Sequence, residues 1–364
     1  YQNKPVWVRM LIALAGPVTN FILAIVIYWG LFMVGVTHIK PIIGHVIPQS
    51  IAAKAGLKSG DQILKVDGMR TPGWQRVMLA IASRLGDKNT LKLRVLPKGN
   101  PTPQTFYLSL ASWKINPRQP RLLQSLGLTP YRPKVPAIIG AILPDSPAQR
   151  AGLQLNDHIL KVAKVRTPYW SDVIKVIQHH PKKTVPFEIK RNAQLKTIPV
   201  TLGEKHFSGK RIGFLGVIVK LPPSAKNLIE VEKYGPFGAI KPAISETWAL
   251  IALHISLLKK MIIGKLSMRM LSGPITIFRA AGQASQAGLI SYLAFIAFIS
   301  AVIGLINLLP IPGLDGGHLL FYVIEAVIRR PVPQRVQLLL FKIGIVLLLF
   351  IIFQATLNDI LRLW

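Results

Sequence analysis

Three segments of this chain are apolar, almost free of charge and long enough to cross a bilayer as helices. They are residues 11–36, 292–309 and 336–354, the last interrupted by Gln337 and Lys342. A bilayer core needs about 20 consecutive, mostly apolar residues of helix. The pattern therefore predicts three membrane spans.

Residues 244–263 have a mixed pattern. Trp248, Ile251 and Ile255 recur at helical spacing, but Glu246 and Lys259 lie among them. We expect an amphipathic helix lying on the membrane or on the protein. The alternative is a fourth span.

Basic residues gather at one end of the predicted spans. They are Lys4 and Arg9 before the first span, and Arg329, Arg330 and Arg335 between the second and third. Lys and Arg favour cytoplasmic loops. All three spans fit one orientation, in which residues 37–290 lie mostly outside and Asp315 lies near the cytoplasmic end.

The outside region contains an internal repeat with an offset of 96 residues. The matching pairs are Gly44 and Gly140, Gly56 and Gly152, Asp61 and Asp157, and Trp74 and Trp170. A period this long predicts tandem globular domains, because solenoid repeats are shorter.

Each copy reads as a strand, a short helix at Ala-x-x-Ala-Gly, a turn, a strand, a longer helix and two more strands. The second copy departs at two turns. Asn156 stands where the first has Gly60, and Ala163-Lys164 stands where it has Asp67-Gly68. We expect the second of these turns to differ between the copies, with the fold retained.

Both copies resemble PDZ domains in the pattern Ser-x-Ala-x-x-Ala-Gly-Leu followed by Gly-Asp-x-Ile-Leu-x-Val-x-Gly, which the first copy fits in full. PDZ domains add an extended peptide to a sheet edge and capture its carboxylate in a Gly-containing loop. The candidate loops are 126–128, with Gly127, and 212–216, with Gly213, Phe214 and Gly216. The alternative is that these glycines merely end strands.

The expected fold class is a multi-pass α-helical membrane protein with two inserted α+β PDZ domains. The expected segments are an N-terminal span (1–36), two PDZ domains (37–131 and 132–221), a linker with amphipathic helices (222–289) and the C-terminal spans (290–364).

Asp315 is the most informative single residue. No charged residue lies between Arg279 and Asp315, so its carboxyl group sits at or near membrane depth. Ionisable groups there are costly unless they pair, line a polar cavity or bind a metal. Pro310 and Pro312 break the helix before it. Metal ligation, a proton relay, and pairing with Lys342 or an arginine are all open.

The amino-acid composition narrows the possible functions of the protein. The chain has no cysteine, which excludes disulfides and thiolate metal sites, and its formal net charge is +31. The positive charge is spread over the whole chain, and no nucleic-acid-binding motif accompanies it. We expect attraction to anionic lipid and no nucleic-acid partner.

The segment from Asn307 through Pro310, Pro312 and Leu314-Asp315-Gly316 resembles the Leu-Asp-Gly motif of site-2 proteases, which are intramembrane zinc metalloproteases. The opening segment with Gly16, Pro17 and Asn20 resembles the second membrane helix of that family, and residues 271–275 and the tandem PDZ domains resemble its bacterial RseP branch.

The resemblance implies a Zn²⁺ ion held by Asp315 and by two histidines of a His-Glu-x-x-His helix, whose Glu is the general base. It also implies a substrate or oxyanion contact for Asn307, with a helix-packing amide as the alternative. Pro310 and Pro312 would shape the turn that presents Asp315, and Asn20 would bond between membrane helices.

No His-Glu-x-x-His occurs among the eight histidines. The family places that motif on a helix upstream of the segment that opens here, so we expect the true N-terminus to be missing. These 364 residues would then hold one zinc ligand of three. A second ligand at His318, three residues after Asp315, is a weaker alternative.

The leading hypothesis is an intramembrane zinc metalloprotease of the bacterial inner membrane. Its transmembrane substrates would be single-span proteins such as anti-sigma factors, or leftover signal peptides. Periplasmic PDZ domains would bind peptides or C-terminal segments and gate access. The alternatives are a non-catalytic PDZ scaffold and a transporter using Asp315 for protons, although no inverted repeat favours the latter.

Overall fold

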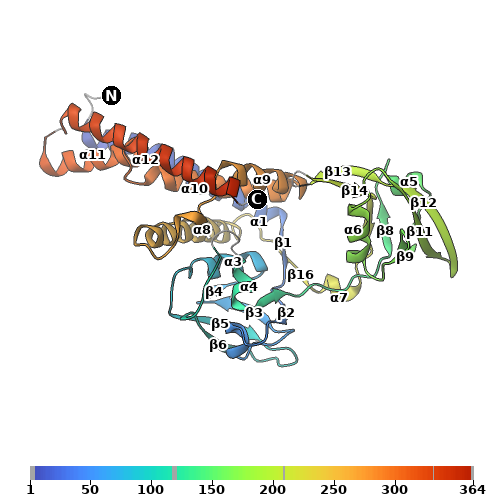
Figure 1. The fold of residues 1–364 in the computed structure, drawn as a ribbon. Helices are drawn as coiled ribbons and strands as arrows, with labels where there is room; N and C mark the ends of the chain where they lie inside the picture. The colour runs from blue at the N-terminus through green and yellow to red at the C-terminus, as the bar shows by residue number, and fades with distance from the viewer. Residues whose placement is uncertain (1–4, 117–120, 208–209, 331, 362–364) are drawn as a thin grey trace. The chain divides into compact units, whose positions relative to one another are not determined.

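The computed structural model describes residues 5–116, 121–207, 210–330 and 332–361. Three helices are long and apolar enough to cross a membrane: α1 (Val6–Val34), α10 (Leu289–Leu308) and α12 (Gln334–Leu361). They confirm the three predicted spans. Figure 1 shows them among the helices of the N- and C-terminal parts of the chain.

Four further helical segments belong to this part of the chain. They are α8 (Ile240–Ile262), the 3₁₀ turn η1 (Met268–Met270), α9 (Pro274–Gln286) and α11 (Asp315–Ile328). In α8, Ala243 and Leu250 are buried, whereas Trp248 and Ile255 are exposed. The apolar stripe that the sequence shows at Trp248 and Ile255 is therefore not the face that packs on the protein. Among the described residues, α8 is not one of the helices that meet the length and composition of a membrane span.

The chain divides into two compact units. The first comprises Tyr1–Tyr131 with Glu230–Trp364, and the second comprises Arg132–Ile229. The first unit thus contains the membrane-length helices together with the first PDZ-like copy. The finer division into five segments remains a prediction.

The first copy is an α+β domain with two small sheets. One sheet has the strand order β4-β3-β5-β6, and the other pairs β2 with β7. The core is apolar and includes Ile43, Val77 and Leu126. Its elements are β2 (Ile43–Val46), α2 (Ile51–Lys54), β3 (Gln62–Val66), β4 (Met69–Arg70), α3 (Trp74–Ala82), β5 (Thr90–Leu96), β6 (Gln104–Ser109), α4 (Leu122–Leu126) and β7 (Leu128–Pro130).

The second copy repeats this plan in its own unit. Its main sheet has the order β10-β9-β11-β12, β15 pairs with β8, and β13 pairs with β14. The core includes Ile139, Val173 and Phe187. Its elements are β8 (Ile139–Ile142), α5 (Pro147–Arg150), β9 (His158–Val162), β10 (Val165–Arg166), α6 (Trp170–Gln178), β11 (Thr184–Arg191), β12 (Gln194–Thr201), β13 (Gly203–Phe207), β14 (Lys210–Phe214) and β15 (Val217–Val219).

The expectation of a different turn in the second copy is wrong. Asp67 and Gly68 have φ angles of 47° and 84°, and Ala163 and Lys164 have 50° and 71°. The reason is the strand pairing: Val66 faces Met69 and Val162 faces Val165, so each hairpin has a two-residue turn. Two-residue turns of type I′ have positive φ at both central residues, and both copies adopt this type despite their different side chains.

A short two-stranded sheet joins α1 and α8 to the rest of the first unit. It pairs β1 (Val36–Ile39) with β16 (Ile229–Glu232), and the short helix α7 (Pro223–Lys226) precedes β16. His38 Nε2 lies 3.1 Å from the Glu232 carboxylate, and the Tyr234 hydroxyl donates to it at 2.6 Å. These bonds, that of His38 first, lower the pKa of Glu232 to about 2.

The first PDZ-like domain packs on α8 through charged contacts. Arg76 of α3 forms an ion pair with Glu246 of α8. Near the other end of α8, Lys260 Nζ lies 2.9 Å from Asp87 and donates to the Ser83 carbonyl at 2.6 Å. Helix α8 is therefore held against α3 at two points.

Candidate functional site

Asp315 is the first residue of α11, and the backbone around it is well bonded. The amides of Gly317 and His318 donate to the Leu314 carbonyl at 3.0 and 3.3 Å, and the Leu314 amide donates to the Ile311 carbonyl at 3.1 Å. The half-buried Asp315 carboxylate thus sits at a helix N-terminus, where the helix dipole favours negative charge.

Small residues allow the turn before Asp315 to pack tightly. A Cβ atom on Gly316 would meet the backbone of Leu308 and Leu309, and one on Gly317 would meet the Ile311 carbonyl. The buried Gly344 of α12 similarly lies against the Pro312 carbonyl oxygen. The turn containing Pro310 and Pro312 is therefore clamped between the start of α11 and α12.

The Asp315 carboxylate faces α1. A Cβ atom built on Gly16 would lie 2.9 Å from Asp315 Oδ2, so a larger residue at position 16 would have to displace the carboxylate. Gly16 is followed by Pro17, which is buried inside α1. The glycine thus allows the carboxylate to pack directly against α1.

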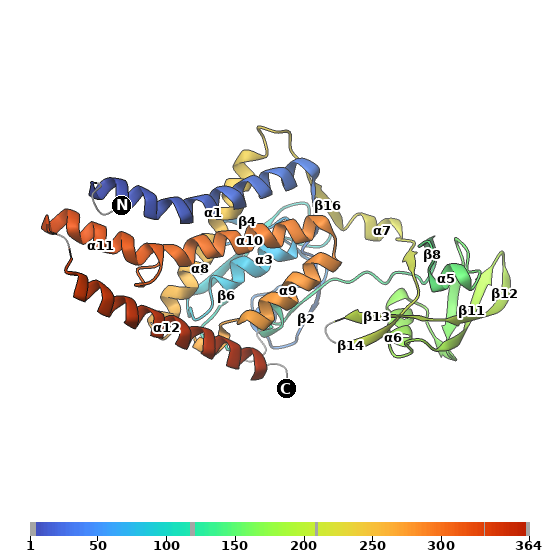
Figure 2. The same ribbon diagram turned by 90° about the horizontal axis from the view of Figure 1, so that it is seen from above.

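Helices α1 and α10 approach each other closely near this point, and Figure 2 shows them side by side. A Cβ atom on Gly304 of α10 would lie 3.0 Å from the Pro17 carbonyl oxygen and 3.1 Å from Asn20 Cβ. The Ser300 hydroxyl donates to the Asn20 carbonyl at 2.8 Å. Asn20 therefore takes part in a hydrogen bond between the two helices.

Asn307 lies one turn beyond Gly304 on α10 and shares its helix face, because residues three apart are neighbours on a helix. It is half-buried, and no hydrogen bond of its side chain occurs among the described residues. Its amide is therefore free to contact a ligand on the side of α10 that faces α1.

Asp315 has no cationic partner within the described part of the chain, so the suggested pairing with Lys342 or an arginine is not present there. Arg9 instead binds Glu325 of α11, at 2.6 and 3.1 Å, and lies over the Tyr322 ring. His318 is exposed and stacks with the same ring.

The expected zinc site can be compared with the side chains that the structure offers as metal ligands. A catalytic zinc site uses three protein ligands. Among residues 5–116, 121–207, 210–330 and 332–361, no group of three His, Cys, Asp or Glu side chains could hold a metal ion. The unpaired Asp315 carboxylate fits a single ligand, but the described residues alone do not form a zinc site.

The two candidate carboxylate loops share one feature. Gly127 and Gly216 have φ angles of 88° and 79°, and each lies against a serine side chain, Ser50 or Ser146. Each serine accepts a hydrogen bond at 3.2 Å from the backbone of the short helix that it caps, α2 or α5. The loops thus have the same geometry in both copies.

The strands that follow these loops are edges. Strand β7 pairs with β2, and β15 pairs with β8, in sheets of two strands. The second side of β7 and of β15 has no strand partner among the described residues. Such an edge can accept an extended peptide.

Gly213 and Phe214 lie earlier, on β14. A Cβ atom on Gly213 would meet the Ile177 carbonyl at the end of α6, so this glycine lets β14 pack against that helix. The counterpart of Gly127 is Gly216, and the offset between them is 89 residues instead of 96. Because this offset differs from 96, the sequence repeat does not align the two glycines. The structure does, because each glycine lies against the serine that caps the short helix of its own copy.

Asp359 near the end of α12 has a structural role that the sequence reasoning missed. Its buried carboxylate accepts hydrogen bonds from the Gly273 amide at 3.0 Å, the Thr276 amide at 2.8 Å and the Thr276 hydroxyl at 2.6 Å. It thereby caps the start of α9 from a distant helix. The sequence did carry a signal for this residue, namely an acidic side chain within an otherwise apolar helix.

The comparisons with known proteins cover the whole chain. The model of peptidase family M50 matches residues 1–351. The chain is 39% identical to the Regulator of sigma-E protease RseP of Salmonella typhimurium (strain 14028s / SGSC 2262) over 363 residues, covering 100% of this chain and 80% of that relative. It is 38% identical to the protein of that name from Escherichia coli (strain K12), with the same coverage.

A relative from Vibrio cholerae serotype O1 (strain ATCC 39315 / El Tor Inaba N16961), named a putative zinc metalloprotease, is 35% identical over 364 residues, again with 80% of its length covered. A family model that matches nearly the full chain, and relatives this similar, agree with the resemblance seen in the sequence. The chain belongs to peptidase family M50 and is a homologue of the RseP-type zinc metalloproteases.

Proposed function

We propose that this chain supplies one zinc ligand, Asp315, and the peptide-docking domains of an intramembrane metalloprotease. The observation that carries the proposal is the Asp315 carboxylate, which is half-buried at the start of α11, packs against Gly16 of α1 and has no cationic partner among the described residues. An ionisable group in such a place needs a positive partner, and a metal ion would provide it.

The rest of the zinc site would come from a His-Glu-x-x-His helix, as the family resemblance implies. Such a helix presents two histidines one turn apart, and the glutamate between them acts as general base. The part of the chain that the structure describes would contribute one donor, the Asp315 carboxylate, to this site. Asn307, on the side of α10 that faces α1, is proposed to contact the substrate backbone or the oxyanion.

The proposed substrates are single-span membrane proteins that have already been trimmed on the outer side, such as anti-sigma factors, or leftover signal peptides. The name of the Salmonella relative, Regulator of sigma-E protease RseP, is consistent with the first class. The proposed location is the bacterial inner membrane, with both PDZ-like domains on the periplasmic side and lipid around α1, α10 and α12.

The PDZ-like domains are proposed to bind peptides or the C-terminal segments of other proteins and to gate access to the membrane site. The support is the repeated loop geometry at Gly127 and Gly216 and the free strand edges β7 and β15. Gly213 and Phe214 would support the second loop from β14. Neither domain contains a cluster of three metal-ligating side chains among its described residues.

The test uses a version of the protein in which a membrane helix with the His-Glu-x-x-His motif, as the family resemblance implies, is joined ahead of Tyr1. Cleavage of a trimmed single-span substrate in proteoliposomes should fall by more than about 100-fold in Asp315→Asn, because a metal site that loses a first ligand loses most of its activity. Glu325→Gln, on the same helix, is the control and should retain cleavage.

Equal cleavage by Asp315→Asn and the parent protein would contradict the proposal. If the parent protein bound peptides through its PDZ-like domains but cleaved nothing, the chain would instead be a non-catalytic membrane scaffold.

A further inference from the structure

The outer face of the main sheet in the first PDZ-like domain carries a row of cations. Lys65 of β3 is directly opposite Arg94 of β5 on one side and Arg70 of β4 on the other. Lys92 lies two residues before Arg94 and therefore on the same face, because side chains alternate along a strand. All four residues are exposed, and together they form the cationic row. The opposite face of the sheet carries core residues such as Leu93.

An open hollow of about 460 Å³ lies over this row. Its lining includes Lys65, Lys92, Arg94 and a single carboxylate, that of Asp67. Both oxygens of Asp67 are engaged, because Arg84 Nε lies 2.8 Å from one and the Lys92 backbone amide donates to the other at 2.9 Å. Within the part of the chain that the structure describes, the side chains of Lys65, Lys92 and Arg94 form no ion pair.

Arg70, at the end of the cationic row, already faces two carboxylates. Its guanidinium lies 3.9 Å from Glu230. The pKa of Glu232 is lowered mainly by His38 and to a smaller degree by the charge of Arg70. The uncompensated part of the row is therefore the group of Lys65, Lys92 and Arg94.

The second PDZ-like domain has the same row with a compensating carboxylate. Lys161 stands at the position of Lys65 and Glu188 at that of Arg94, because each pair is directly opposite on the equivalent strands. Lys161 Nζ lies 2.8 Å from the Glu188 carboxylate. Like charges directly opposite each other on adjacent strands destabilise a sheet. The first domain thus carries a repulsion that the second avoids, and a bound anion would relieve it.

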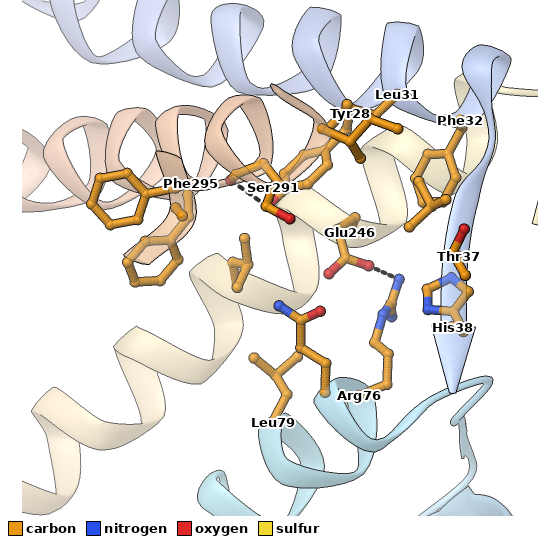
Figure 3. Close-up of a pocket in the computed structure, with 17 residues that line it drawn as sticks. Tyr28, Leu31, Phe32, Thr37, His38, Arg76, Leu79, Glu246, Ser291 and Phe295 are labelled. Carbon is orange, nitrogen blue, oxygen red and sulfur yellow. Dashed lines mark hydrogen bonds and ion pairs between the residues drawn. The ribbon is translucent and has the colours of Figure 1, made fainter. Parts of the chain in front are cut away.

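Lipid headgroups are an unsuitable source of this anion. Helix α3 packs on the inner face of the sheet, and Figure 3 shows Arg76 of α3 beside Glu246 of α8. Helix α8 in turn packs on α1 and α10, which have the length and composition of membrane spans. The cationic row lies on the other face of the sheet, so it points away from these helices.

The layout of the row suits an acidic protein segment. Residues two apart on a strand are separated by about 7 Å, which is the separation of Lys92 and Arg94 along β5. Alternate side chains of an extended partner segment repeat at the same interval. Tyr107 of β6 is directly opposite Lys92 and is 60% exposed, so it offers an apolar contact to a polypeptide that a free inorganic anion would not use.

We propose that the first PDZ-like domain binds an acidic segment of a partner protein on its cationic row, with carboxylates of the segment on Lys65, Lys92 and Arg94. This surface belongs to the four-stranded sheet and not to the sheet of β2 and β7, so the partner needs no free C-terminus. The second domain lacks the site, because Glu188 occupies the position of Arg94. The first domain would thereby select partners by charge.

The experiment uses the full chain in phosphatidylcholine nanodiscs and the peptide Gly-Ser-Glu-Ser-Glu-Ser-Glu-Gly, with a fluorophore at its N-terminus. Its C-terminus is amidated, which removes the carboxylate that PDZ loops capture. Fluorescence anisotropy measures the dissociation constant. The same peptide with glutamine in place of each glutamate is the control ligand and should not bind.

The decisive variant is Arg94→Glu, which copies the arrangement of the second domain. It should weaken binding of the acidic peptide at least about tenfold, as expected for the loss of a hydrogen bond between charged groups. It should also raise the melting temperature, because the repulsion with Lys65 is removed. Lys190→Glu, at an exposed position on β11 of the second domain, changes the net charge equally and should leave binding unchanged.

Equal weakening by Arg94→Glu and Lys190→Glu would overturn the proposal, because it would reflect net charge and not the cationic row. Unchanged peptide binding by Arg94→Glu, or no peptide binding by the parent protein, would also overturn it. So would binding of phosphatidylglycerol vesicles that Arg94→Glu abolishes while the peptide fails to bind, which would assign the row to a lipid surface.

Discussion

At the residue scale, single buried carboxylates form hydrogen bonds that hold together segments far apart in the sequence. Asp359 satisfies two backbone amides and a hydroxyl at the start of α9, where the first amides of a helix lack partners within the helix. Asp157 in the second PDZ-like domain binds Arg191 through two contacts of 2.7 Å, and this contact raises the pKa of Arg191. Both are fully or almost fully buried.

Asp359→Ala should lower the free energy of unfolding by about 3 kcal/mol, because several hydrogen bonds to a charged group are lost and buried amides are left unpaired. Thermal unfolding in detergent micelles would measure the loss. Thr356→Ala on the same helix is the control, since Thr356 bonds only within α12 among the described residues. A loss no larger than that of the control would show that the cap contributes little.

The turn at Ala163 and Lys164 carries more strain than the Asp67-Gly68 turn of the first copy. Left-handed backbone costs a non-glycine residue about 1–2 kcal/mol. Replacing these residues with Asp and Gly, the pair found at positions 67 and 68, should therefore stabilise the second domain by about 1 kcal/mol. Slower hydrogen exchange of the β9 and β11 amides would register the gain, and faster exchange would contradict it.

At the element scale, the turn that presents Asp315 depends on how closely α12 approaches it. Gly344→Ala would place a Cβ atom against the Pro312 carbonyl, and such overpacking typically costs about 1–3 kcal/mol. The matched control is Gly30→Ala in α1, where a Cβ atom meets nothing within 4 Å. Gly344→Ala should therefore melt at a lower temperature than Gly30→Ala. Equal melting temperatures would show that the close packing at Gly344 contributes little to stability.

The sheet of β1 and β16 is predicted to be sensitive to acid. The pKa of Glu232 is lowered from 4.5 to about 2, mainly by His38, so the ionised carboxylate stabilises the fold. That contribution is complete above pH 4.5 and is lost as the pH falls toward about 2.

The difference in melting temperature between wild type and Glu232→Gln should thus shrink as the pH falls from 4.5 toward 2. A difference that stays constant down to pH 3 would contradict the assignment. His45→Gln, which alters a histidine outside this sheet, should not reproduce the effect.

At the scale of the whole molecule, the sequence predicted the class of each part well. Apolar length alone identified α1, α10 and α12, and the 96-residue offset identified two domains of one fold. These features depend on local patterns, which a sequence displays directly. Asp315 was equally visible, because a lone charge within an apolar region is conspicuous.

Contacts between distant segments were not predictable in the same way. Gly16 and Gly304 look like ordinary helix residues until α1 and α10 are placed side by side. The Arg76–Glu246 pair joins a domain to a helix 170 residues later. Two-residue hairpin geometry likewise overrode the side chains at Ala163 and Lys164. Such features depend on tertiary packing, which local patterns do not specify.

The central claim is the proposal that Asp315 ligates zinc when a His-Glu-x-x-His helix supplies the other ligands. The direct measurement is the zinc content of purified protein, preceded by the His-Glu-x-x-His helix, after dialysis against a weak chelator. The account predicts about one zinc per chain for the parent protein and for Glu325→Gln, and a loss of affinity of at least about 10-fold for Asp315→Asn. Equal zinc retention by Asp315→Asn and the parent protein, with both folded, would contradict the account.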